Sequence, residues 1–194
     1  MSILAIAGSP SPASRSTALA GWAAARLRAA GHEVDTLEVR ALPATDLLLA
    51  RTDSVALGQA LDAVEAARGV IVATPVYKGA YAGALKAFLD LLPQRGLAGK
   101  VVLTLATGGS PAHTLAVEHA LRPVLSALDA QIVVDGVFVA DAHYARRAGE
   151  GGERGGEWLL AAEAEQRLEA ALDRFDEALL RYRWPLEGTR RAAA

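Results

Sequence analysis

The stretch that decides the fold is Met1 to Thr17, MSILAIAGSPSPASRST, an apolar run that ends at Gly8 and passes into a loop of serines and prolines with one arginine. The apolar run predicts a buried strand, and the serines after it predict the start of a helix. Gly8 allows the chain to turn sharply away from the strand. We therefore expect a strand, a tight loop and the beginning of a helix here.

This first loop carries the kinds of groups with which proteins bind a phosphate. The start of a helix offers unpaired N–H groups and the positive end of the helix dipole. Hydroxyl and guanidinium donors stand close to it in the sequence, on Ser9, Ser14, Arg15, Ser16 and Thr17. No G-x-G-x-x-G and no G-K-[ST] follows the strand, so a monophosphate such as the tail of FMN fits better than a dinucleotide. The alternative is a loop that only caps the helix through Ser14 or Ser16.

Composition narrows the class of protein. The 194 residues suit one domain, for which we expect residues 1–184, followed by a flexible tail at 185–194. The net charge of −2 suggests neither a nucleic-acid nor a membrane partner, and it disfavours a strongly acidic electron carrier. Cysteine is absent, which excludes disulfides and thiolate metal sites. We find no apolar run long enough to span a membrane and no basic segment before the first one, so we expect a cytoplasmic protein.

The hydrophobic pattern predicts a doubly wound α/β fold. The segment 32–39 alternates polar and apolar residues, as a strand at a sheet edge does, whereas three later runs are apolar on both faces, as in buried parallel strands. Those runs are 70–73, 101–105 and 132–139, and helical patterns occupy 54–68, 79–92, 111–129 and 157–182. Right-handed crossovers and a polar second strand favour a five-stranded parallel sheet of order 2-1-3-4-5. We expect 40–53 to be irregular and 149–156 to be a flexible connection.

Ligands of such sheets bind at the carboxyl ends of the strands, where three loops should meet. In the second loop, Pro75 follows the strand directly, and the segment from Pro75 through Val76 and Tyr77 to Lys78 could form a stiff wall for a flat ring. Tyr77 could instead be a half-buried core aromatic. We also expect an ion pair between Lys86 and Asp90, one helical turn apart.

The third loop brings backbone close to the same crevice. Gly108 and Gly109 after Thr107 carry no side chain that would block a ligand. His113 follows, and it could be a capping residue or a catalytic one. No nucleophile triad, carboxylate pair or metal-ligand spacing surrounds these loops. Hydrolysis is therefore poorly supported, whereas chemistry borne by a flavin is well supported.

The three loops together resemble a known family. The segments GSPSPASRST, ATPVYKGAYAGALKAFLDLLP and GKVVLTLATGGSPAHTLAVEHALRPVLSALDAQ are similar to the NADPH-dependent FMN reductases of the flavodoxin-like superfamily. The greatest similarity is to the FMN reductases that serve alkanesulfonate monooxygenases. The resemblance implies a flavodoxin-like fold, with FMN and NADPH (or NADH) as cofactors. It implies FMN phosphate binding by Ser9, Arg15, Ser16 and Thr17, a ring wall of Pro75, Val76, Tyr77 and Lys78, and a far edge of Thr107, Gly108 and Gly109.

The fourth helical pattern carries an internal proline. Pro123 cannot donate a hydrogen bond to the carbonyl of His119, so we expect a kink or a π-bulge there. The apolar arc of this helix is too wide for one sheet face, which predicts burial against another subunit, in a dimer or tetramer. The resemblance implies a tyrosine at the position where this chain has His119. His119 could modulate the flavin, or it could only border the site.

We therefore expect an NAD(P)H-dependent FMN reductase, with no catalytic side chain, that supplies reduced flavin to a two-component, sulfonate-type monooxygenase. A quinone, azo-dye or metal-ion reductase with tightly held FMN is the alternative enzyme. A flavodoxin-like electron carrier without enzymatic activity is the alternative outside enzymes.

Overall fold

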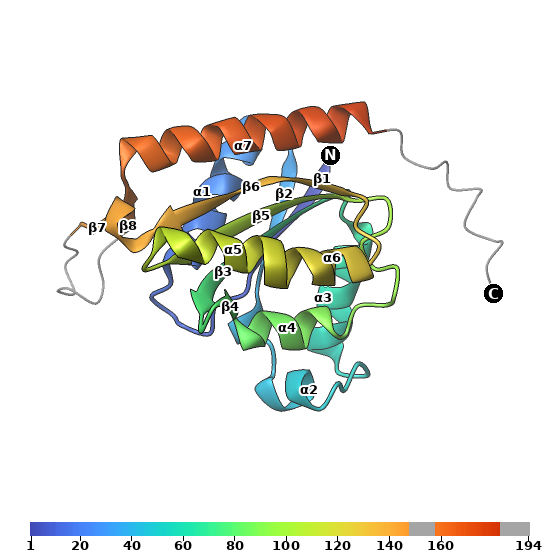
Figure 1. Cartoon of the computed structure of the whole chain (residues 1–194). Coiled ribbons are helices and arrows are strands. Elements are labelled where there is room, and N and C mark those ends of the chain that lie inside the picture. Colours follow the sequence, from blue (N-terminus) through green and yellow to red (C-terminus); the bar gives the residue numbers. More distant parts are fainter. Residues whose placement is uncertain (148–157, 183–194) are drawn as a thin grey trace.

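A computed structural model of the chain describes residues 1–147 and 158–182. Within them a parallel sheet runs in the order β2-β1-β3-β5-β6 (Figure 1). These strands are β1 (Ser2–Ala7), β2 (Glu33–Glu38), β3 (Gly69–Tyr77), β5 (Val101–Gly108) and β6 (Ile132–Ala140). The expected order 2-1-3-4-5 is therefore confirmed, with the short β4 as an addition. The polar second strand lies at the sheet edge, paired with β1 alone.

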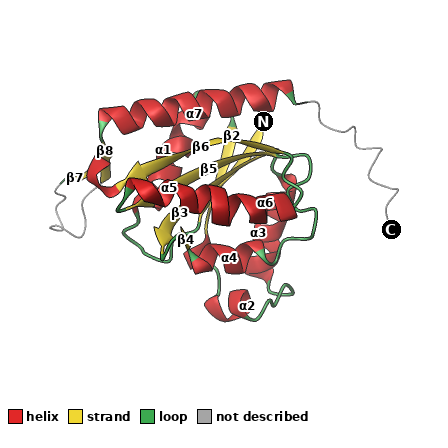
Figure 2. Cartoon of the chain, in the orientation of Figure 1, coloured by secondary structure: helices red, strands yellow, loops and turns green. Residues whose placement is uncertain are grey.

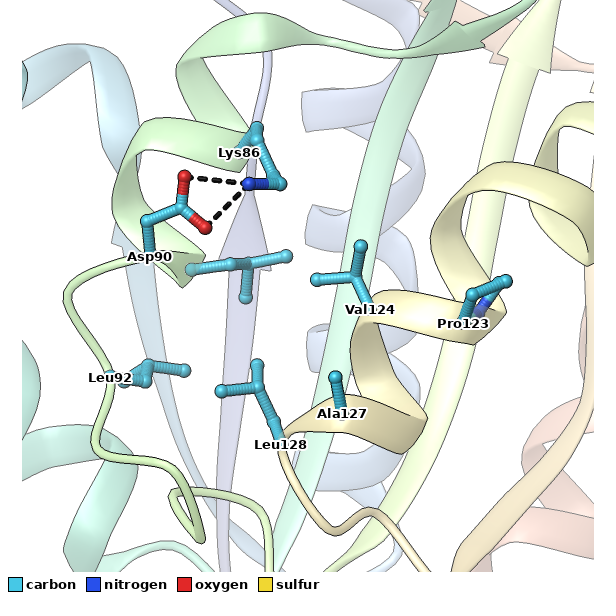
Figure 3. Close-up of a pocket in the computed structure, with 8 residues that line it drawn as sticks. Lys86, Asp90, Leu92, Pro123, Val124, Ala127 and Leu128 are labelled. Atoms are coloured by element: carbon cyan, nitrogen blue, oxygen red, sulfur yellow. Dashed lines mark hydrogen bonds and ion pairs between the residues drawn. The ribbon is translucent and has the colours of Figure 1, made fainter.

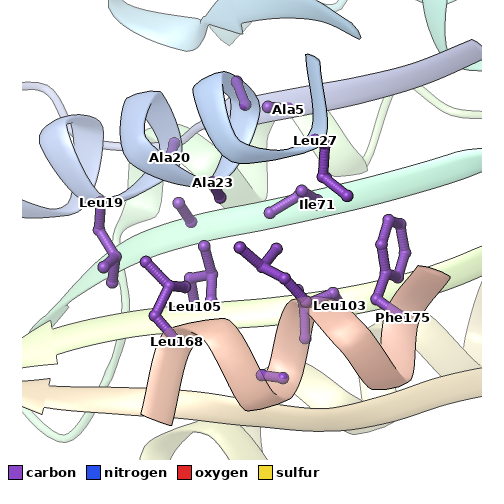
Figure 4. Packing of buried hydrophobic residues seen from close by; sticks show 14 of the residues in the cluster. Ala5, Leu19, Ala20, Ala23, Leu27, Ile71, Leu103, Leu105, Leu168 and Phe175 are labelled. Carbon is purple, nitrogen blue, oxygen red and sulfur yellow. The ribbon is translucent and has the colours of Figure 1, made fainter. Parts of the chain in front are cut away.

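Helices cover both faces of the sheet, as a doubly wound fold requires (Figures 1 and 2). On one face α1 and α7 pack against the strands, and Figure 4 shows Leu19 and Leu27 of α1 with Leu168 and Phe175 of α7 in that core. The other face is covered by α3, α4 and α6. The helices are α1 (Arg15–Ala29), α2 (Ala44–Leu48), α3 (Val55–Ala66), α4 (Gly83–Leu89), α5 (Thr114–Ala116), α6 (Arg122–Ala127) and α7 (Ala162–Arg181).

A β-hairpin replaces the first turn of the helix that we expected over 79–92. β3 continues to Tyr77, so Pro75 and Val76 lie inside the strand and not after it. The antiparallel strand β4 (Ala80–Tyr81) then pairs back onto β3. Lys78 and Gly79 between them both have positive φ, 52° and 77°, as in the turns that match the twist of a hairpin. The helix therefore begins only at Gly83.

A second hairpin corrects the helix that we expected over 157–182. Trp158 and Leu159 belong to strand β8 (Trp158–Leu160), which pairs with β7 (Tyr144–Arg146), and α7 begins after it. Two strands this short carry too few residues for a clear alternating pattern. The expected flexible connection at 149–156 and the expected tail at 185–194 lie outside the described residues.

Two further regions differ in detail from the expectation. The irregular segment 40–53 contains α2 and part of the 3-10 turn η1 (Val39–Ala41). The helical pattern over 111–129 is divided into the 3-10 turn η2 (Pro111–His113), α5, the π-helix η3 (Val117–Leu121) and α6. Another 3-10 turn, η4 (Asp141–His143), links β6 to β7.

Nowhere in the described chain is there a helix both long and apolar enough to cross a bilayer.

Candidate functional site

The sheet register brings the three predicted loops to one edge. Ala7 at the end of β1 pairs with Ala73 of β3, and Pro75 of β3 pairs with Thr107 of β5. The backbone N–H of Gly8 also donates to the carbonyl of Ala73, at 2.8 Å. The first, second and third loops therefore leave neighbouring strands side by side, as the sequence predicts.

The first loop forms a buried network of hydroxyls at the start of α1. Ser14 is the N-cap, and its Oγ accepts a hydrogen bond from the backbone N–H of Thr17 at 3.2 Å. The hydroxyls of Ser14 and Ser16 lie 2.9 Å apart, and Ser9 accepts from the backbone N–H of Ser11 at 3.2 Å. Ser9 and Ser16 are almost fully buried. The capping interpretation is thus correct for Ser14, whereas Thr17 Oγ1 is buried with no hydrogen-bond partner in the described chain.

Close packing leaves no room for a side chain at Gly8. A Cβ at this position would lie 2.6 Å from the Cβ of Leu85 in α4. Glycine therefore does more here than permit a turn, because it allows α4 to approach the first loop.

Arg15 extends from the first turn of α1 toward the β7–β8 hairpin. Its Nη1 lies 3.5 Å from Oδ1 of Asp141, with the two side chains 36% and 41% exposed. Its guanidinium carbon lies 4.6 Å from the ring centroid of Trp158 and 6.0 Å from that of Tyr144. The sequence gives no signal for these three neighbours, because two of them lie on a hairpin whose strands are too short to show an alternating pattern.

The second loop is a β-hairpin that carries an exposed aromatic side chain beside its turn. Tyr77 is 48% exposed, which disfavours the interpretation as a core aromatic, whereas Val76 beneath it is buried. Thr74 Oγ1 accepts a hydrogen bond from the backbone N–H of Ala82 at 3.0 Å, which ties the two ends of the hairpin together. Lys78 is exposed in the turn.

The third loop brings bare backbone to the same edge. Thr107 and Gly108 are buried and Gly109 is exposed. A Cβ on Gly108 would lie 2.8 Å from Nδ1 of His113, so this histidine ring packs on the glycine backbone. A Cβ on Gly109 would lie 3.8 Å from Oδ2 of Asp141. Asp141 therefore stands between the first loop and the third.

A π-helix follows the third loop, as Pro123 predicts. It spans Val117–Leu121, and Pro123 lies in the first turn of α6 directly after it. His119 lies within this π-helix and is exposed. η3 packs against β4 of the second-loop hairpin, so the bulge lies beside the strand-end site.

A separate groove of about 330 Å³ lies between α4 and α6 (Figure 3). None of the predicted site residues lines it. At its rim Lys86 Nζ lies 2.5 Å from Oδ1 of Asp90, which confirms the expected ion pair and raises the pKa of Lys86 through that hydrogen bond. The groove is otherwise apolar, with Leu89, Leu92, Val124 and Leu128 among its lining residues.

The fold, with three loops leaving neighbouring strand ends, defines a flavodoxin-like α/β protein. The family model described as NADPH-dependent FMN reductase matches residues 1–145. A relative named "FMN reductase (NADPH)" from Pseudomonas putida KT2440 is 47% identical, and the match covers 93% of this chain and 89% of the relative. A relative of the same name from Escherichia coli K12 is 46% identical, and the match covers 93% of this chain and 91% of the relative. A Pseudomonas putida relative named "NADH-dependent FMN reductase SfnE" is 36% identical over 75% of this chain and 80% of the relative.

Solved structures agree with this placement. The apo structure of an NADH:FMN oxidoreductase, EMOB, superposes with a TM-score of 0.81 at 38% identity, covering 97% of this chain and 93% of that one. A Bacillus cereus flavodoxin at 16% identity has a TM-score of 0.60, which supports the flavodoxin-like fold alone. The chain belongs to the NADPH-dependent FMN reductase family, and it is an NAD(P)H:FMN oxidoreductase.

Proposed function

We propose that the three strand-end loops hold one FMN, with its phosphate at the start of α1. The phosphate ligands are Ser9, Arg15, Ser16 and Thr17. The flavin ring lies along Pro75, Val76, Tyr77 and Lys78, and its far edge meets Thr107, Gly108 and Gly109. The observation that carries this proposal is the register that aligns the ends of β1, β3 and β5.

The residues present fit the phosphate of FMN. The hydroxyl of Thr17 is buried without a hydrogen-bond partner in the described chain, and such a group is costly unless a ligand or water satisfies it. It stands at the start of a fifteen-residue helix whose first N–H groups have no intrahelical partners. Ser14 caps one of these N–H groups and orients the hydroxyl of Ser16.

The chain's own contribution to the reaction is binding and orientation. When bound, FMN supplies the group that accepts a hydride from the nicotinamide. Tyr77 is 48% exposed and Gly109 carries no side chain, so this edge of the sheet is accessible from outside, where the nicotinamide must approach. No side chain is assigned a proton-transfer role, and His119 at the adjacent π-helix is at most a modulator.

We infer that the reduced FMN is passed to a separate flavin-dependent monooxygenase of the sulfonate type. The resemblance of the loops to reductases of alkanesulfonate systems supports this step. The relative named as an NADH-dependent reductase leaves NADH as an alternative donor to NADPH.

The test is to record the visible spectrum of the purified protein and to follow NADPH loss with and without added FMN. Colourless protein whose NADPH oxidation depends on free FMN supports the proposed delivery of reduced flavin. Bound yellow flavin with activity toward quinones or azo dyes alone would instead indicate the alternative reductase. An absence of NADPH oxidation under every condition would leave only the electron carrier.

We further propose that a second copy of this chain packs on the face formed by η3 and α6. Leu115 at its edge is 59% exposed, and Val124 lines the open apolar groove of Figure 3. His119 lies on the π-helix of this face. His119→Ala should therefore change the molecular mass in solution or the affinity for FMN, measured by light scattering and fluorescence titration. If both stay unchanged, His119 only borders the site.

A further inference from the structure

The guanidinium of Arg15 lies within a cluster of aromatic rings that the β7–β8 hairpin builds. Trp158 presents its ring 4.6 Å from the guanidinium carbon, within the range of a cation–π interaction. Tyr144 supports Trp158 edge to face, with ring centroids 6.1 Å apart, and stacks on Trp22 of α1 at 6.2 Å. The cluster therefore connects the hairpin to the same helix that carries Arg15.

The interior of this cluster is shielded from water and holds a second guanidinium, that of Arg146, whose central carbon also lies 4.6 Å from the Trp158 ring centroid. Burial raises the pKa of Tyr144, so its hydroxyl remains protonated across the physiological range. Nε of Arg15 is buried without a hydrogen-bond partner in the described chain. The rings thus hold the inner part of the guanidinium, while its outer nitrogens stay accessible to an anion.

Asp141 lies beside one of these outer nitrogens, Nη1 of Arg15. The 3.5 Å between Arg15 Nη1 and Asp141 Oδ1 exceeds the 2.7–2.9 Å typical of a strong charge-assisted hydrogen bond. Both side chains are more than one third exposed, so water screens the pair and its contribution is small. The carboxylate also lies beside Gly109, at the third loop.

We propose that Trp158 and Asp141 set the strength with which Arg15 binds the FMN phosphate, in opposite directions. Trp158 is a positioning residue, because its ring restricts a long side chain that otherwise loses much rotamer freedom on binding. Asp141 competes with the phosphate for the same guanidinium and repels the bound dianion. The result is a phosphate site that binds FMN and also releases it. This inference rests on the proposed function.

The experiment compares FMN with riboflavin, which has the same ring system and no phosphate. Dissociation constants for both are measured by fluorescence titration on the full chain. Trp158→Ala should weaken FMN binding about three- to tenfold, the range of a partly exposed cation–π contact, and leave riboflavin binding unchanged. Trp158→Phe keeps an aromatic face and should restore most of the FMN affinity.

Asp141→Asn should change FMN affinity in the opposite direction, and asparagine is nearly identical to aspartate in shape. This variant should tighten FMN binding about two- to fivefold, the effect of removing one screened like charge, and again leave riboflavin binding unchanged. The inference is overturned if Trp158→Ala weakens both flavins equally, which would mean a general role in folding. It is also overturned if Asp141→Asn leaves FMN binding unchanged or weakens it.

Arg15→Ala separates this inference from the function on which it rests. It should weaken FMN binding by about ten- to a hundredfold, as for a lost charged hydrogen bond, and abolish the preference for FMN over riboflavin. If that preference survives, the assignment of Arg15 to the phosphate is wrong. If Arg15→Ala abolishes the preference, adding Trp158→Ala to the Arg15→Ala variant should weaken FMN binding no further, because both substitutions act through the Arg15 guanidinium. An additive loss there would overturn the positioning role.

Discussion

Gly8 directly follows the last residue of β1, and its backbone packs closely against Leu85 of α4. Gly8→Ala should lower the free energy of unfolding by about 1–3 kcal/mol, because its Cβ would meet a Cβ that moves only with the backbone of α4. Denaturant unfolding measures the change. Gly21→Ala is the matched control, because Gly21 is exposed within α1 with nothing within 4 Å of an added Cβ, and it should stabilise by about 0.5–1 kcal/mol. Equal stability of Gly8→Ala and the unaltered chain would contradict the packing argument.

Single residues of the first loop could be predicted as donors from their type and position after a strand. The groups that these residues contact could not be predicted in the same way. Ser14 and Ser16 hydrogen bond to each other, and Arg15 turns toward an acid and a tryptophan far along the sequence. Such contacts depend on which segments the sheet brings together, and residue types alone do not encode this.

Among the elements, the π-helix was predictable and the two hairpins were not. Pro123 removes a hydrogen bond at a defined carbonyl, so the bulge at His119 follows from local chemistry. The β7–β8 hairpin consists of strands too short to show a period, and its ring contacts with Trp22 form only in the tertiary fold. Tertiary packing thus overrode the helical pattern that extends back to Trp158.

The β3–β4 hairpin allows a test of its turn. Gly79 has φ of 77° with open space around it, so Gly79→Ala introduces a cost from backbone conformation alone. We expect a loss of about 1–2 kcal/mol in the free energy of unfolding, measured with urea. Gly83→Ala at the start of α4 also has open space but no positive φ, and it should be nearly neutral. Identical effects of the two substitutions would refute the assigned turn.

At the scale of the whole molecule, strand order and the meeting of three loops followed from hydrophobic patterning, because parallel strands deliver their carboxyl ends to one edge. α7 packs on the sheet through its apolar stripe, and polar contacts that patterning does not reveal join it to α1 and to the turn after α1. Arg26 of α1 pairs with Glu169 at 2.6 Å, and His32 Nε2 lies 2.8 Å from Asp176 Oδ1. These contacts join α7 to the α1 side of the core, and in the chain α7 directly follows the hairpin that supports Arg15.

The most direct measurement is a crystal structure of the chain grown with FMN. We predict the phosphorus atom beside the N-terminus of α1, with its oxygens within hydrogen-bond distance of Thr17 Oγ1 and of the Arg15 guanidinium, and the flavin ring against Tyr77. An FMN bound elsewhere, for example in the groove between α4 and α6, would contradict the account.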